Sequence, residues 1–131
     1  MIIYIGIVVC VILIFYSLQT KIVFFPKYVY KKAIRGDYKN VIIKLYIRPF
    51  TLYNQYRKSN KMRFSSAVVI CITNMYGKGN FKQAVSYLDE KFIYKIGETV
   101  YPTEPFDLSN EICESGIHAF NTFDEAVKYN F

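Results

Sequence analysis

Two side chains near the C-terminal end could support nucleophilic chemistry, the thiol of Cys113 and the imidazole of His118. A histidine beside a cysteine can accept the thiol proton and leave a reactive thiolate. The two residues are close enough in sequence to meet across a turn. The sequence offers no evident third group to orient the histidine and no evident oxyanion-stabilising donors. We therefore expect no catalytic residue, and we expect His118 to be a hydrogen-bonded structural residue.

The same residue types also bind metals, but they are too few here. A structural zinc site needs about four ligands. Outside the apolar N-terminal segment the chain has two cysteines, Cys71 and Cys113, and one histidine. We therefore predict no metal site, and no other motif in the chain indicates a cofactor.

These residues belong to a longer pattern, C-x-x-G-I-H-x-F-x-T-x-x-E-A-x-x-Y, which runs over residues 113–129. Its first part predicts a strand over residues 116–120. Gly116 indicates an unusual backbone conformation or a close approach where the strand starts. Since side chains alternate along a strand, Ile117 and His118 should point to opposite faces, with Phe120 on the face of His118.

The second part of the pattern predicts a terminal helix over residues 122–130. Thr122 can cap its first turn, and Glu125 at the third helical position completes a capping box. Ala126 and Tyr129 are three residues apart and should share one face of the helix. We assign a structural role to the motif residues Cys113, Gly116, Ile117, His118, Phe120, Thr122, Glu125, Ala126 and Tyr129.

The motif resembles an uncharacterised domain family that is common in large DNA viruses of protists and some phages, where it often sits beside pentapeptide repeats. Two upstream segments share the resemblance, which covers roughly residues 38–131. They are K-x-R-x-S-x-A-x-V at Lys61–Val69 and Y-K-I-G-E-T-V at Tyr94–Val100, the latter followed by the Phe106-Asp107 pair. The resemblance implies a viral protein. The family has no established reaction to transfer.

A second, more distant similarity suggests an enzyme. The G-I-H-x-F strand followed by the E-A-x-x-Y helix is similar to a strand and helix of ADP-ribosyltransferases. No catalytic glutamate can be placed on this chain. We keep an ADP-ribosyltransferase-like activity as an alternative.

The N-terminal segment is uncharged and apolar from Ile2 to Leu18. Its 17 residues predict a transmembrane helix, since about 20 apolar residues cross a bilayer. A cleaved signal peptide is a poorer fit, because a basic start and small residues at a cleavage site are missing. A buried core helix is a further alternative, although few helices in soluble proteins are apolar all round.

The charge of the chain is unevenly distributed. Residues 21–82 carry 14 lysines and arginines and a single acidic residue, Asp37, whereas residues 83–131 carry 3 basic and 9 acidic residues. A basic block after an apolar one is typical of a membrane surface, and the aromatic residues within it also suit stacking on single-stranded nucleic acid. Proximity to the predicted span favours lipid, so nucleic acid is the less expected partner. The predicted membrane-surface residues are Lys21, Lys27, Lys31, Lys32 and Arg35.

Hydrophobic periodicity predicts the remaining elements. With 53% hydrophobic residues and three cysteines, the chain is neither a disordered protein nor a disulfide scaffold. We predict strands over residues 41–48, 67–73 and 92–100, the last with a bend at Gly97, and a helix over residues 80–90. The predicted fold class is α+β, with an N-terminal transmembrane helix followed by one small domain that has a mixed or antiparallel sheet and two short helices. The parts are a transmembrane anchor (1–20), a basic and aromatic juxtamembrane segment (21–37) and the small domain (38–131).

The expected function follows from these parts. We expect a membrane-anchored structural or interaction protein, of viral origin, that holds its domain at the cytosolic, capsid-facing side of a membrane. The positive-inside rule places the N-terminus outside or in the lumen. The expected location is the inner membrane of the virion or a host membrane, and the expected partners are the lipid bilayer and other proteins, capsid components if the protein is viral. The alternatives are the ADP-ribosyltransferase-like enzyme and a module that binds lipid or nucleic acid.

Overall fold

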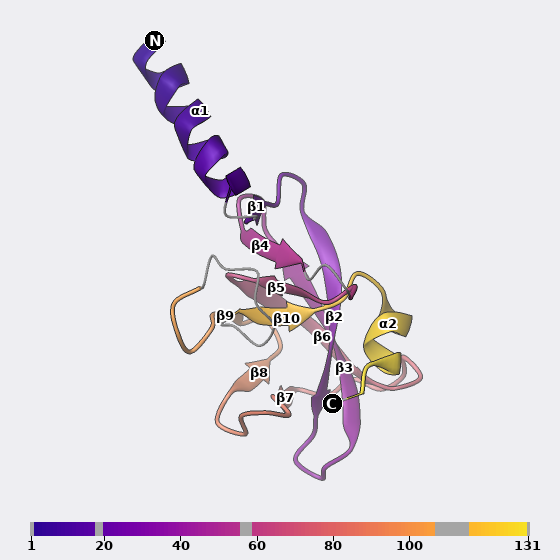
Figure 1. The fold of residues 1–131 in the computed structure, drawn as a ribbon. Coiled ribbons are helices and arrows are strands. Elements are labelled where there is room, and N and C mark those ends of the chain that lie inside the picture. The colour runs from indigo at the N-terminus through magenta and orange to yellow at the C-terminus, as the bar shows by residue number, and fades with distance from the viewer. Residues whose placement is uncertain (1, 18–19, 56–58, 107–115, 131) are drawn as a thin grey trace.

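The fold is built from two antiparallel sheets and two helices (Figure 1). The structure, a computed structural model, describes residues 2–17, 20–55, 59–106 and 116–130. The elements are α1 (Ile2–Ser17), β1 (Lys21–Ile22), β2 (Lys27–Ile34), β3 (Asn40–Ile47), β4 (Leu52–Gln55), β5 (Met62–Phe64), β6 (Ala67–Asn74), β7 (Gln83–Val85), β8 (Ile93–Lys95), β9 (Thr99–Val100), β10 (Ile117–Ala119) and α2 (Phe123–Lys128).

The larger sheet has six strands in the order β8-β7-β2-β3-β6-β9. Its centre is β3, which pairs with β2 over the full length from Lys27↔Ile47 to Ile34↔Asn40. Residues 40–47 favour a strand because they are rich in β-branched side chains. Alternate side chains of β3 are buried on the inner face, as expected for a strand with one face against the core.

The smaller sheet has four strands in the order β1-β4-β5-β10. Its last strand joins the larger sheet, because the backbones of Tyr30 and Phe120 exchange two hydrogen bonds of 2.8 Å. The inner faces of the two sheets share one hydrophobic core, with Leu45, Phe64 and Ile117 among its buried members. The bridge therefore holds β10 beside β2, and both strands contribute to the candidate site.

The N-terminal apolar segment forms helix α1 in the described residues. Helix α1 has 16 residues, about 24 Å at ~1.5 Å per residue, against a hydrocarbon core of about 30 Å. In the described part of the chain, no helix combines the length and the apolar character that crossing a bilayer requires. The predicted transmembrane helix is therefore wrong, and with it the predicted fold class and the single-pass membrane localisation with a cytosolic domain.

The helix predicted over residues 80–90 is also wrong. Residues 83–85 form β7, which pairs with β8 and meets β2 at Ile34↔Val85. The apolar residues of this segment do not form one helix face. Ala84 enters the core, and the ring of Phe81 packs against the guanidinium of Arg35, whose central carbon lies 4.2 Å from the ring centroid. Pairing with the following strand β8 and with β2, which is distant in sequence, outweighs the local helical pattern.

Other predicted elements match the structure. The strands predicted at 41–48, 67–73 and 116–120 correspond to β3, β6 and β10. Gly97 has φ +83° and separates β8 from β9, as its predicted bend requires. The predicted terminal helix is present as α2, although it ends at Lys128.

Residues 21–37 are part of the folded unit. They contain β1 and β2, and β2 lies between β3 and β7 in the larger sheet. Val23 is buried and its backbone N–H donates to the carbonyl of Thr51 at 2.9 Å. The segment expected to lie between anchor and domain therefore supplies a central strand.

Candidate functional site

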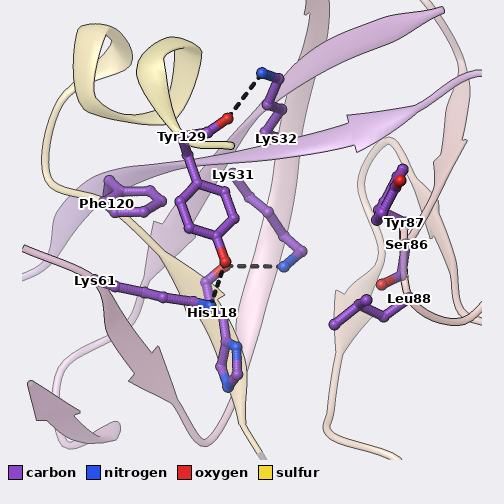
Figure 2. A pocket seen from close by; sticks show the side chains of 9 residues that line it. All are labelled: Lys31, Lys32, Lys61, Ser86, Tyr87, Leu88, His118, Phe120 and Tyr129. Carbon is purple, nitrogen blue, oxygen red and sulfur yellow. Dashed lines mark hydrogen bonds between the residues drawn. The ribbon is translucent and has the colours of Figure 1, made fainter. Parts of the chain in front are cut away.

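A cavity of about 80 Å³ lies where β2, β10 and the end of α2 meet the turn between β7 and β8 (Figure 2). Nine residues line it: Lys31, Lys32, Lys61, Ser86, Tyr87, Leu88, His118, Phe120 and Tyr129. A second cavity of about 230 Å³ shares Lys31, Ser86, Leu88 and His118 with the first. The two cavities therefore adjoin each other, and we call them together the β2–β10 cleft.

Lys31 enters the cleft from the inner face of β2. Its neighbours on that face, Val29 and Ala33, are fully buried in the core. The ammonium group donates a hydrogen bond of 3.0 Å to the backbone carbonyl of His118. Burial lowers the pKa of Lys31 to about 8, with a smaller contribution in the same direction from the positive charge of Lys61. Lys31 is therefore a charged group held where charge is poorly solvated.

Lys61 enters the cleft from the residue before β5. Its ammonium donates a hydrogen bond of 2.8 Å to the hydroxyl of Tyr129 and lies 4.7 Å from the centre of that ring. The ring of Tyr129 in turn packs on Phe120 at a centroid distance of 5.2 Å. In Figure 2 the side chains of Lys31, Lys61 and Tyr129 point toward one another, with Ser86, Tyr87 and Leu88 across the gap.

Lys32 positions this wall of the cleft. It donates to the backbone carbonyls of Val127 and Tyr129, at 3.2 and 2.9 Å. These carbonyls lie at the C-terminal end of α2, where a cation compensates the partial negative charge of the helix end. Lys32 thus ties Tyr129 to β2.

The glycine of the sequence motif permits a close approach of two strands. Gly116 has φ +150°, and a Cβ added there would lie 2.8 Å from the Cβ of Arg63. Arg63 is fully buried and its guanidinium lies 4.9 Å from the ring of Phe106. In the register of the small sheet Arg63 faces both Asn54 and His118, so a row of polar side chains crosses β4, β5 and β10.

The other motif residues divide between core and cleft. Ile117 and Ala119 are buried in the core, whereas His118 and Phe120 line the cleft. The alternation predicted for this strand is therefore present. Cys113, the proposed partner of His118 in thiolate chemistry, lies outside the described residues.

The helical half of the motif positions Tyr129. The hydroxyl oxygen of Thr122 accepts a hydrogen bond from the backbone N–H of Glu125 at 3.2 Å and donates to its carboxylate at 2.8 Å. Ala126 is buried in a small cluster with Phe120, against which Tyr129 packs. The Thr122 cap and the buried Ala126 hold α2 in place, and Tyr129, its C-cap residue, therefore reaches the cleft.

The five residues predicted to contact a membrane surface do not gather on one face. Lys27 and Lys31 point inward from β2, and Lys32 binds the end of α2. Arg35 forms an ion pair with Asp37 at 2.6 Å, and Lys21 is exposed on β1. The structure brings only Lys31 and Lys32 into the cleft.

Sequence reasoning missed four residues of the first cavity. Lys61 lies in the K-x-R segment that carried part of the resemblance, and this was the one available signal. Ser86, Tyr87 and Leu88 follow β7 in a segment predicted to be helical, so their position could not be inferred.

The segment that carries these residues also matches a family model. The match is to DUF5758, a family of unknown function, and extends over residues 17–126. The chain belongs to this family. No curated protein and no solved structure matches the chain. The DUF5758 match includes most of the cleft and ends before Tyr129. Because the DUF5758 family has no assigned function, the expected viral origin, virion packaging and capsid–membrane tethering have no support from it.

Proposed function

We propose that this DUF5758 domain is an interaction module that binds an anionic group, a phosphate or a carboxylate, in the β2–β10 cleft, and that it is not an enzyme. One observation carries the proposal. Two ammonium groups, those of Lys31 and Lys61, converge on a cavity that has no acidic residue among its nine lining residues. In the described part of the chain their hydrogen-bond acceptors are a backbone carbonyl and a phenol, and neither acceptor carries a negative charge.

The electrostatics of the cleft favour an anion. A partly buried ammonium is poorly solvated, so its attraction to an incoming anion is stronger than at an open surface. An anion also relieves the repulsion between the two lysines and raises the pKa of Lys31. The hydroxyls of Ser86 and Tyr129 lie on the same cavity and can donate further hydrogen bonds.

The adjoining cavity suggests what the rest of the ligand carries. It is lined by Asp89 and Glu104 together with the rings of Phe92 and Tyr94. Carboxylates accept hydrogen bonds and attract cations. We therefore propose a ligand with an anionic group at one end and a hydrogen-bond donor or cation at the other.

Calorimetric titration of the full chain with inorganic phosphate, sulfate and acetate tests the proposal. We expect Lys61→Gln and Lys31→Met each to weaken binding by about tenfold, which corresponds to ~1.4 kcal/mol. The control is Lys78→Gln, which removes an exposed lysine in a turn outside the cleft. Equal binding by all three variants, or no binding of any of the anions, would contradict the proposal.

The ADP-ribosyltransferase alternative is favoured by one observation, since His118 and Tyr129 line the same cavity. The residues that line this cavity offer no carboxylate for catalysis. Adding NAD to the titration separates the two functions. Release of nicotinamide from NAD would favour the enzyme, whereas binding without turnover would favour the module.

A further inference from the structure

The outer face of the six-stranded sheet is only partly covered. Helix α2 packs over one end of it, where Ile42, Phe120 and Ala126 form a small buried cluster with Tyr30 and Phe123 at its edge. Figure 1 shows α2 beside one part of β2 and β3 while the strands continue beyond it. At the other end of this face, Tyr28 and Ile70 remain exposed in the described part of the chain.

Aromatic side chains occupy the uncovered end. Tyr28 and Tyr46 are cross-strand partners, and their rings lie 5.7 Å apart at an angle of 54°. Val68 continues the same row on β6, and Ile70 of that strand is exposed. Tyr28 is half-exposed, at 49%. A row of flat and branched side chains on open strands forms a platform that a planar group can cover.

Two positively charged side chains lie at this platform. Lys44 lies on the same face, with its ammonium 4.3 Å from the centre of the Tyr28 ring. Arg48 follows the end of β3 and is exposed, with a hydrogen bond to the hydroxyl of Thr99 at 3.2 Å. The strands β2, β3, β6 and β9 contain no aspartate or glutamate. The face therefore complements a polyanion.

We propose that this uncovered end, which we call the Tyr28–Tyr46 face, binds single-stranded nucleic acid. Unpaired bases stack on the two tyrosine rings, and the phosphates are neutralised by Lys44 and Arg48. The ring of Tyr28 is half-exposed, and the ammonium of Lys44 lies over it as a cation–π partner. When a base takes that place, the flexible lysine side chain can move to the neighbouring phosphate.

The chemistry of the face favours a single strand over other partners. Base stacking on aromatic rings contributes about 1–3 kcal/mol per base, and it requires bases that are not already stacked in a duplex. A purely apolar protein partner would leave Lys44 and Arg48 without compensation at the interface. The face is separate from the β2–β10 cleft, so the two proposals can fail independently.

Fluorescence anisotropy of the full chain with a labelled oligo(dT) strand tests the proposal. We expect Tyr28→Ala and Tyr46→Ala each to weaken binding by at least about fivefold, and Tyr28→Phe to retain it, because the phenyl ring still stacks. The matched control is Tyr76→Ala, which removes an exposed tyrosine from a turn away from this face. Lys44→Gln should reduce the slope of log K against log salt by about 0.7.

Further measurements distinguish base stacking on this face from general electrostatic attraction to a polyanion. Lys78→Gln, which removes an exposed lysine outside both this face and the cleft, should leave oligo(dT) binding within about twofold. A matched duplex should bind more weakly than the single strand. Thermal melting of each variant checks that the fold is retained. The proposal is overturned if folded tyrosine variants bind like the wild type, if Tyr76→Ala loses as much affinity, if the duplex binds as tightly, or if anionic vesicles bind and oligo(dT) does not.

Discussion

Lys31 lies on the inner face of β2 between two fully buried residues, Val29 and Ala33. Its aliphatic stem extends the core while its ammonium reaches the carbonyl of His118. Keeping the ammonium of Lys31 charged in this poorly solvated site reduces the free energy of unfolding. Because that charge is lost as the pH rises, the stability of the protein depends on pH.

The free energy of unfolding should rise with pH through the titration of Lys31. Its pKa is about 8 in the folded protein, against an ordinary lysine value of 10.5 in the unfolded chain. Between these values the unfolded chain binds more protons, so raising the pH favours the folded state. Below about pH 8 Lys31 is protonated in both the folded and the unfolded state, so its destabilising effect no longer changes with pH. Urea unfolding between about pH 7 and pH 9.5 measures this slope.

Lys31→Met should reduce the dependence of the free energy of unfolding on pH. The variant should be more stable than the wild type at about pH 7, and this difference should shrink toward about pH 9.5. The matched control Lys78→Met should leave the slope unchanged, because Lys78 is exposed. Measurements stay below about pH 10, because burial raises the pKa of Tyr94 and its titration acts in the opposite direction above that pH. A wild-type slope that survives in Lys31→Met would contradict the assignment.

Gly116→Ala should destabilise the protein by more than about 1 kcal/mol. The backbone there has φ +150°, and the new methyl group would lie 2.8 Å from the Cβ of Arg63, which has no room to move inside the sheet. Gly36→Ala is the control, since no atom lies within 4 Å of a Cβ built there. The difference in urea midpoint between the two variants is the measurement, and equal midpoints would show that the approach of β10 to β5 is not constrained.

At the scale of elements, α2 shows how a short helix can be stable. A helix of 6 residues is too short to form alone in water. It is held by the Thr122 cap at one end, by the Lys32 ammonium at the other and by the buried Ala126 between them. Because Tyr129 follows directly, the stability of this helix also positions one wall of the cleft.

Thr122→Ala should reduce the free energy of unfolding by about 1 kcal/mol through loss of the cap. Thr122→Ser should restore most of it, because a serine hydroxyl can accept the same hydrogen bond from the Glu125 N–H. Tyr129→Ala should cost more, about 2 kcal/mol, because the half-buried ring loses its packing on Phe120. Chemical denaturation measures all three, and negligible effects throughout would mean that α2 is not docked.

At the scale of the whole molecule, the two sheets depend on segments that are far apart in the sequence. The Tyr30–Phe120 bridge joins strands separated by most of the domain. Lys27 donates to the side chain of Asn121 at 2.9 Å, between β10 and α2. At the opposite edge, β1 pairs with β4 and buries Val23 and Thr20.

These contacts predict where the folded unit begins. The sequence alone predicts that a chain starting near Tyr28 folds with cooperative melting. In the structure such a chain would lack β1, the buried Val23 and Lys27, so we expect it to be less stable than a chain starting at Thr20 by at least about 2 kcal/mol, the value of one buried valine. Urea unfolding of both chains is the measurement. Equal stability would show that β1 does not contribute to the fold.

Local patterns in the sequence determined the elements whose stability is mainly local. The β-branched runs gave β3 and β6, and the Thr122–Glu125 spacing gave the N-cap of α2, because propensity and capping act within a few residues. The strand that carries His118 followed from alternation in the same way. The family motif marked this region but supplied no chemistry for it.

Only the tertiary structure decided the pairing and the site. Residues 83–85 have a helical pattern, but hydrogen bonds to β2 and β8 make them a strand. The sequence placed Lys31 among five basic surface residues, and it points into the cleft because strand pairing fixes which face each residue of β2 presents. Lys61, His118 and Ser86 are far apart in the sequence, and their meeting depends on how two sheets close on each other, which no local pattern encodes.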